Sequence, residues 1–222
     1  MNIFDCITTR RSVRKFQKKE VDDRLIGVML HMATHAPSAG NIQDWHFLIV
    51  RDEKVKEKLF TAALHQPPLK EAPLVIVVCT DLEKTSLRFG KRGETFYSVQ
   101  DTASAITILL LTAHALGLGA LWVGSFDEER VKDILQLPEK LRPVALIPVG
   151  YAAEKPEMPK RIPFENLTWI ERFGKKYDMS YYFQPGPKGE ARMKPIGNRI
   201  EDILKKYRER IKEKKKLTFS ED

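Results

Sequence analysis

The sequence predicts a domain that mixes helices and strands, followed by a basic appendage. Helix-like and strand-like patterns alternate up to residue 150 without an internal repeat. One run, LVIVVC at 74–79, is continuously apolar, and a longer apolar tract over 96–123 has a helical pattern. Hydrophobic residues make up 42% of the 222-residue chain and charged residues 31%, so the chain has enough apolar material for a core.

Three helices are predicted before residue 65, over 2–10, 22–36 and 52–64. Each starts at an Asn or Asp that can cap its first turn, and the second has apolar residues at helical spacing. Pro37 forbids the second helix from continuing. A further capping residue, Asp127, predicts a helix to about residue 135.

Four strands are predicted, over 45–50, 74–79, 119–123 and 142–150. The second is rich in β-branched residues and shows no polar alternation, so we expect it to be buried on both faces.

The apolar tract over 96–123 has to be weighed as a membrane span. Polar residues interrupt it, and Gly117 and Gly119 end it. We therefore expect a helix that starts near Thr95 and is buried all round inside a soluble domain, with no membrane contact. His114, which this helix carries, is then expected to be a core or interface histidine.

The chain is expected to divide into a domain over 1–173 and an extension over 174–222. Residues 151–173 are rich in proline and charge and are expected to form a connecting arm. Residues 180–197 are expected to be loop-like, and a capping-box pattern predicts a helix near 198–216.

Most of the positive charge lies in this extension. Residues 174–222 hold 14 Lys and Arg against 8 Asp and Glu. A basic tail can favour nucleic acid, but a solvated helix face is the commoner meaning, so nucleic-acid binding is not expected. Cys6 and Cys79 cannot form a disulfide framework, and the N-terminus lacks the apolar core of a signal peptide. A cytoplasmic protein with reduced thiols is expected.

Several motifs of nucleotide-binding and hydrolytic enzymes are absent. The chain has no GxxxxGK[ST], no GxSxG, no HExxH and no GxGxxG after a strand. His31 and His35 could share one helix face, but no third ligand completes a metal site, so no metal is expected.

Three segments carry the residues that suit a polar, planar ligand. RRSVR at 10–14 offers guanidinium groups and a hydroxyl for a phosphate, although it could equally be a basic surface turn. PSAGNIQ at 37–43 offers small residues and polar edges, and GLGALWVGSFD at 117–127 leads from a strand into a helix. Taken alone, each of the last two could be an ordinary connecting loop.

The order and spacing of these segments resemble the FMN-dependent nitroreductase family. The resemblance runs from RRSVRKF through APSAGNIQDWHFLIV, EAPLVIVVC and the long apolar tract to LRPVALIPVGYAAEKPEMPKR, and so covers most of residues 1–173. It implies an α+β fold with a central, mainly antiparallel sheet flanked by helices. It also implies an intertwined homodimer with FMN bound in the subunit interface. The extension with its C-terminal helix lies outside the resemblance.

The resemblance also implies which residues bind FMN. Those near the phosphate and the ribityl chain are Arg10, Arg11 (through its backbone), Ser12, Lys160 and Arg161. Arg14 matches the position beside the flavin N1–C2=O edge. The loop that the other subunit lays against the ring matches Pro37, Ser38, Ala39 and Asn41, and the turn beside N5 matches Trp122, Val123, Gly124 and Ser125. One further polar contact falls on His65, Gln66 or Lys70, and we select Gln66.

The implied activity is that of an oxidoreductase. A hydride from NADH or NADPH would reach flavin N5 and pass to a small-molecule acceptor such as a nitroaromatic or a quinone, with no dedicated catalytic side chain. The alternative is a flavin-binding sensing or partner-docking module of the same fold that does not turn over NAD(P)H.

Overall fold

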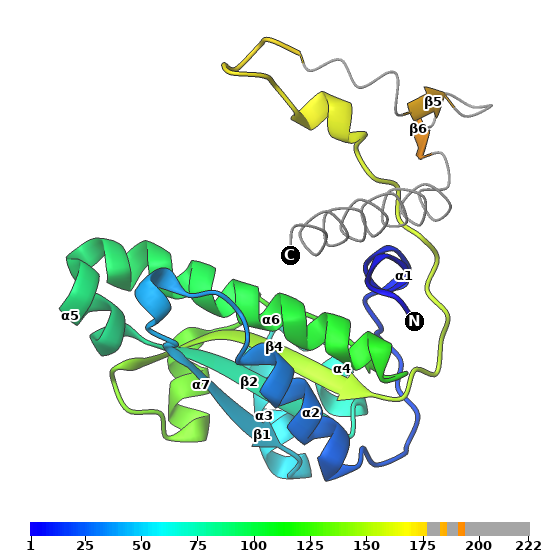
Figure 1. Cartoon of the computed structure of the whole chain (residues 1–222). Helices are drawn as coiled ribbons and strands as arrows, with labels where there is room; N and C mark the ends of the chain where they lie inside the picture. Colours follow the sequence, from blue (N-terminus) through cyan, green and yellow to red (C-terminus); the bar gives the residue numbers. More distant parts are fainter. Residues whose placement is uncertain (177–182, 186–190, 194–222) are drawn as a thin grey trace, which may run out of the picture. The chain divides into compact units, whose positions relative to one another are not determined.

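The computed structural model describes residues 1–176, 183–185 and 191–193 of the chain (Figure 1). These belong to two compact units, Met1–Met158 and Pro159–Asp222. The expected division at residue 173 stays a prediction. The helix predicted near 198–216 lies outside the described residues.

A four-stranded sheet lies at the centre of the first unit. Its strands are β1 (Trp45–Val50), β2 (Leu74–Asp81), β3 (Gly119–Ala120) and β4 (Leu141–Gly150), in the order β1-β2-β4-β3. Every neighbouring pair is antiparallel. Helices flank this sheet (Figure 1), so the predicted α+β fold is confirmed.

Helices connect the strands at the places where capping residues occur. Asn2, Asp22, Asp52 and Asp127 each accept a backbone N–H in the first turn of the helix that follows, as predicted. The seven α-helices of the described residues are α1 (Ile3–Thr9), α2 (Asp23–Ala33), α3 (Glu53–Ala62), α4 (Pro68–Glu71), α5 (Leu82–Arg92), α6 (Ser98–Ala115) and α7 (Glu128–Leu135).

The central strand β2 divides the core into two layers. Leu74, Ile76 and Val78 pack with residues of α2 and α6 on one face, whereas Val75 and Val77 pack with residues of α3 and α7 on the other. This alternation follows the period of two along a strand. Every residue of β2 is buried, as the sequence predicts.

The region between β2 and α6 differs from the prediction. The chain forms α5 at residues that carry no predicted helix, and a π-helical turn, η2 (Gly93–Tyr97), leads into α6. A Cβ on Gly93 would lie 2.2 Å from the carbonyl oxygen of Thr85, so the turn packs tightly against α5. Helix α6 starts at Ser98 rather than near Thr95, and one of its faces, including Gln100 and Thr107, is exposed. The expectation that this helix is buried all round is therefore wrong for the single chain.

Helices α2 and α3 and strand β3 are shorter than predicted. Helix α2 ends at Ala33 rather than 36, and α3 ends at Ala62, because the backbone turns to positive φ at Leu64 and His65. The strand expected over 119–123 pairs as β3 only at Gly119–Ala120. Among the described residues, no helix is long and apolar enough to cross a membrane.

The second unit contains short elements. A 3₁₀ turn, η3 (Phe164–Leu167), is followed by a bridge between Trp169 and Lys176. Two strands, β5 (Phe183–Pro185) and β6 (Ala191–Met193), pair antiparallel. The expectation that residues 180–197 are loop-like is therefore wrong at these two strands.

Candidate functional site

The segment 10–14 runs along the edge of the sheet next to β3. Ser12 forms a parallel bridge with Ala120, and the Val13 N–H donates to the Ala120 carbonyl oxygen at 3.1 Å. Val13 is buried, whereas Arg14 on the other side of the extended backbone is exposed. The alternation of an extended chain thus leaves Ser12 and Arg14 on the side opposite to the buried valine.

A carboxylate that sequence reasoning missed holds this segment from the other side. Glu154 Oε1 accepts the backbone N–H groups of Arg14 at 2.6 Å and Lys15 at 3.2 Å. The Ala153 N–H donates in turn to the Lys15 carbonyl oxygen at 2.9 Å. Backbone hydrogen bonds therefore fix the position of Arg14, and its side chain adds a longer contact, from Nη1 to the Ser12 carbonyl oxygen at 3.5 Å.

Arg11 turns back toward helix α1. Its Nη1 donates to the carbonyl oxygens of Thr8 at 2.8 Å and Arg10 at 2.7 Å, at the carboxyl end of the helix. The adjacent Thr9 hydroxyl lies 2.8 Å from Nε2 of His114 on α6. Burial lowers the pKa of His114, and the positive charges of Arg10 and Arg11 lower it further. His114 therefore joins α1 to α6.

The turn 122–125 follows β3 along the edge of β4, where Leu146, the partner of Val123, pairs with Val77 in the middle of β2. Val123 is buried and bridges Leu146, whereas Trp122, Gly124 and Ser125 are exposed. A Cβ on Gly124 would come no closer than 3.6 Å to any side chain, so packing does not require glycine there. The backbone of Gly124 is open to a ligand.

Gln66 contacts this turn directly. Its Nε2 donates to the Ser125 carbonyl oxygen at 3.1 Å. Among the candidates His65, Gln66 and Lys70, Gln66 therefore has a hydrogen bond to the predicted turn 122–125. The turn 122–125 that Gln66 contacts follows directly on β3, beside which the segment 10–14 lies.

The loop 37–43 lies at the opposite end of the sheet from the segment 10–14. It leads into β1, whose first residue, Trp45, pairs with Thr80 near the end of β2, whereas Val149 beside the start of β2 pairs with Ala120. The eight residues of β2 span roughly 25 Å at 3.3 Å per residue. One chain alone therefore cannot bring loop 37–43 to the segment 10–14.

Hydrogen bonds within the loop and from helices α5 and α6 hold the loop in shape. The Ala39 N–H donates to Asp101 Oδ1 on α6 at 2.8 Å, and the Gln43 N–H donates to the Ser38 hydroxyl at 3.0 Å. Arg88 Nη1 on α5 donates to the Gly40 carbonyl oxygen at 2.6 Å. Gly40 has a φ of +56°, a conformation that favours glycine. The contacts of Asp101 and Arg88 with this loop were not predicted from the sequence. Asp101 could have been noticed, because it is the one acidic residue in the apolar tract over 96–123.

Two buried carboxyl groups lie beneath this loop. Burial raises the pKa of Asp44 to about 6, with a contribution from the neighbouring Asp101, while a hydrogen bond from the Thr80 hydroxyl opposes the change. Burial also raises the pKa of Asp101. One oxygen of each carboxyl group, Asp44 Oδ1 and Asp101 Oδ2, is buried without a hydrogen-bond partner among the described residues.

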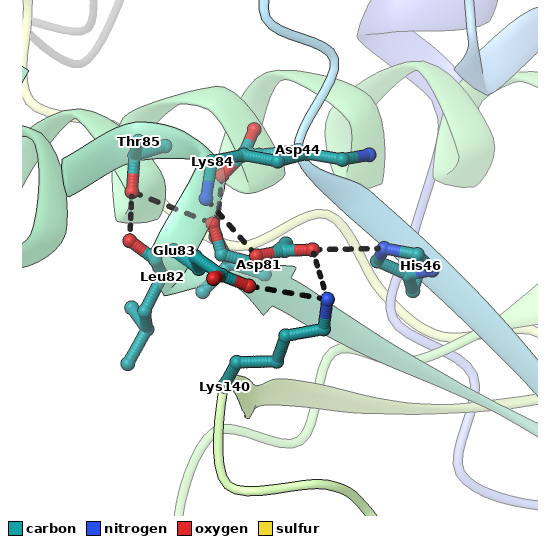
Figure 2. Close-up of polar contacts among 9 residues, drawn as sticks. Asp44, His46, Asp81, Leu82, Glu83, Lys84, Thr85 and Lys140 are labelled. Atoms are coloured by element: carbon teal, nitrogen blue, oxygen red, sulfur yellow. Dashed lines mark hydrogen bonds and ion pairs between the residues drawn. The ribbon is translucent and has the colours of Figure 1, made fainter. Parts of the chain in front are cut away.

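Asp81 is the centre of a neighbouring polar cluster, whose contacts cap a helix and form ion pairs (Figure 2). Asp81 Oδ1 caps α5 by accepting the Lys84 N–H at 3.1 Å, while its Oδ2 lies 3.8 Å from His46 Nε2 and 3.9 Å from Lys140 Nζ. Lys140 also pairs with Glu83 at 3.2 Å. No group of His, Cys, Asp and Glu side chains in the described part of the chain is arranged to hold a metal ion.

Lys160 and Arg161 belong to the second unit, where both are exposed. Their predicted contact with a phosphate stays a prediction.

The family model of the nitroreductases matches residues 7–151, which contain every predicted site residue except Lys160 and Arg161. The chain belongs to the nitroreductase family. Membership of this family makes the chain an oxidoreductase.

Individual relatives agree with this assignment. A Methanothermobacter thermautotrophicus protein whose name pairs NADH dehydrogenase with NAD(P)H nitroreductase is 40% identical over 70% of this chain and 80% of its own. A Bacillus subtilis FMN reductase (NADPH) is 25% identical over 76% of this chain and 74% of its own. A crystal structure from Bacteroides thetaiotaomicron, with the same paired name as the first, is 30% identical, covers 77% of this chain and 97% of its own, and has a TM-score of 0.68.

Residues at the sheet end fit a flavin mononucleotide chemically. The cation of Arg10 and the hydroxyl of Ser12 suit a phosphate and a polyol. The cation of Arg14 and the open backbone of Gly124 suit the polar edges of a planar ring.

Proposed function

We propose that this nitroreductase is an FMN-dependent NAD(P)H oxidoreductase whose site is built from two chains. The observation that carries the proposal is the distance, within one chain, between predicted site residues that should contact the same flavin. The segment 10–14 lies beside Ala120, near the start of β2, whereas loop 37–43 leads into Trp45, near the end of β2. Gln66 contacts the turn 122–125 between these two positions. A two-fold related partner supplies the loop of one chain to the site of the other.

Exposed apolar side chains support a homodimer. They lie on α1, on α2 and at the start of α6, and they include Ile3, Phe4, Ile7, Val28, Met32 and Val99. Such side chains left in contact with water are typical of a surface that another subunit covers. Obligate interfaces of this kind bury more than about 2,000 Å².

Each group of residues has a separate proposed role. Arg10, the backbone of Arg11, Ser12, Lys160 and Arg161 bind the phosphate and ribityl chain. Arg14 lies beside the N1–C2=O edge, where its charge favours the reduced flavin. Gln66 and Trp122–Ser125 bind the polar side of the ring. Pro37, Ser38, Ala39 and Asn41 of the partner cover it.

FMN, when bound, would supply the two-electron redox chemistry that links NADH or NADPH to the acceptor. With a quinone acceptor, one proton from solvent completes the hydroquinone. The protein side chains position the reactants and exclude water, and none forms a covalent bond. Nitroaromatics and quinones are the acceptor classes we propose.

Anaerobic reduction of the FMN-loaded protein by NADH and NADPH in parallel tests this function. We expect the visible absorbance of the flavin to bleach with at least one nucleotide and to return when a quinone is added. A yellow protein inert to both nucleotides would instead support a flavin-binding sensing or docking module.

A further inference from the structure

A cluster of cations and aromatic rings lies at the junction of α5 and η2. The Cζ atom of Arg92 lies 4.8 Å from the ring centroid of Phe96 and 5.3 Å from that of Tyr97, and Arg92 Nε donates to the Tyr97 hydroxyl at 3.0 Å. Tyr97 meets Phe89 edge to face at 5.2 Å, and Arg88 Cζ lies 5.4 Å from the Phe89 ring. We call these five residues the cation–aromatic cluster.

The cluster presents positive charge and an aromatic surface to solvent. Arg88, Arg92 and Phe96 are exposed, Phe96 to 44%. Within the part of the chain that the structure describes, no carboxylate forms an ion pair with Arg88 or Arg92, whereas the intervening Lys91 is paired with Glu94 at 3.0 Å. Stacking on the rings holds the guanidinium of Arg92 in place without neutralising it.

The cluster adjoins loop 37–43. Besides the bond from Arg88 to the Gly40 carbonyl oxygen, a Cβ on Gly40 would lie 2.7 Å from Arg88 Cζ, so the guanidinium packs directly on the loop. The proposed function places this loop against the flavin ring of the partner. The cluster of one chain then borders the exposed ring face on which the acceptor of the other chain stacks.

We propose that the cation–aromatic cluster selects the electron acceptor and favours planar aromatic acceptors that carry an anionic group, such as a sulfonate or a carboxylate. Phe96 offers an apolar ring beside the stacked acceptor, and Arg92 offers fixed donors to its anionic group. This inference rests on the proposed function, because the position of the flavin comes from it.

The test compares naphthoquinone with its ring-sulfonated derivative as acceptors of the FMN-loaded full-length protein. Arg92→Gln removes the charge and keeps a polar, although shorter, side chain. We expect it to raise the KM for the sulfonated quinone about tenfold, with less than about a twofold change for the neutral one. Arg92→Lys should restore part of the preference. Added salt should reduce the preference of the wild-type protein.

Arg130→Gln is the matched control, because Arg130 is an exposed arginine on α7, where it pairs with Asp127 at 3.3 Å. It should leave both KM values unchanged. Equal KM values for the two quinones in the wild-type protein, or an equal change for both in Arg92→Gln, would overturn the inference and leave the proposed function intact. A protein that binds no FMN, or that reduces neither quinone, would overturn both.

Discussion

The backbone N–H of Val13 donates to the carbonyl oxygen of Ala120 at 3.1 Å, and the neighbouring Gly119 leaves room for the Val13 side chain. A Cβ on Gly119 would lie 2.8 Å from three side-chain atoms of Val13. The absence of a side chain at Gly119 therefore allows the segment 10–14 to lie alongside β3. This contact joins two of the sequence motifs into one surface.

Gly119→Ala is expected to lower stability, whereas Gly124→Ala is expected to leave it nearly unchanged. Gly119→Ala overpacks the contact with Val13 and should lower the free energy of unfolding by about 1–3 kcal/mol. Gly124→Ala meets only ordinary contacts, so it should leave thermal stability nearly unchanged and weaken FMN binding. Thermal unfolding of the apoprotein and fluorescence titration with FMN measure the two effects. Equal loss of stability in both variants would contradict this difference.

Arg14 and Arg10 should affect different properties of the bound flavin. A charge-assisted hydrogen bond is worth roughly 1.5–3 kcal/mol, and ~30 mV corresponds to about 1.4 kcal/mol for a two-electron couple. Arg14→Ala should therefore lower the midpoint potential by some tens of millivolts and slow hydride uptake. Arg10→Ala should weaken FMN binding with little change in potential. Redox titration of both variants at saturating FMN measures the two midpoint potentials. An unchanged potential in Arg14→Ala would refute the proposed position of Arg14.

The pKa of His114 provides a test of the phosphate position that does not depend on activity. The charges of Arg10 and Arg11 contribute to lowering this pKa, after burial. An anion bound by Arg10 offsets that contribution, so FMN should raise the His114 pKa more than riboflavin, which lacks the phosphate. NMR titration of the imidazole in the two complexes measures the difference. The same pKa in both complexes would place the phosphate elsewhere.

The buried carboxyl group of Asp44 should make stability depend on pH. Its pKa in the folded protein is raised to about 6 from 3.8. The stabilising contribution of the protonated group is therefore fully present below pH 3.8 and is lost as pH rises through 6. Since Asn is neutral throughout, Asp44→Asn should remove part of this decline, about 1–3 kcal/mol between pH 4 and 7.

Urea unfolding of both proteins at several pH values checks this prediction. Asp101 also has a raised pKa, so some pH dependence should remain in Asp44→Asn. The matched variant Asp133→Asn, at an exposed position of α7, should keep the wild-type pH profile. Parallel profiles for wild type and Asp44→Asn would contradict the assigned pKa.

Local chemistry explains why much of the fold is predictable from sequence. An Asn or Asp cap and the continuous apolar run of β2 act within a few residues, so Asn2, Asp52 and β2 were identified correctly. Helix α5 was missed because it is highly charged and contains Gly90. It forms where Asp81 caps it and Gly93 packs on Thr85.

In the candidate site, too, features set by neighbouring residues were predicted and features set by tertiary contacts were not. The segments 10–14 and 122–125 carry recognisable local motifs, and the structure brings them together. Glu154 and Asp101 act on residues that are 140 and 62 positions away in the chain. Such partners are set by tertiary packing, which no local spacing encodes.

Subunit complementation tests most directly the claim that one flavin site needs two chains. One chain carries Arg10→Glu, which reverses the charge at the proposed phosphate position, and a differently tagged chain carries Ala39→Trp in the covering loop. Each homodimer should bind FMN poorly, because both of its sites are altered. In the mixed dimer one site receives both changes and the other receives neither. If each site needs two chains, the purified mixed dimer should bind FMN and oxidise NAD(P)H at one of its two sites. A doubly tagged wild-type dimer gives the reference values for two sites. A mixed dimer with no functional site would show that loop and phosphate residues of the same chain form the site, and would contradict the account.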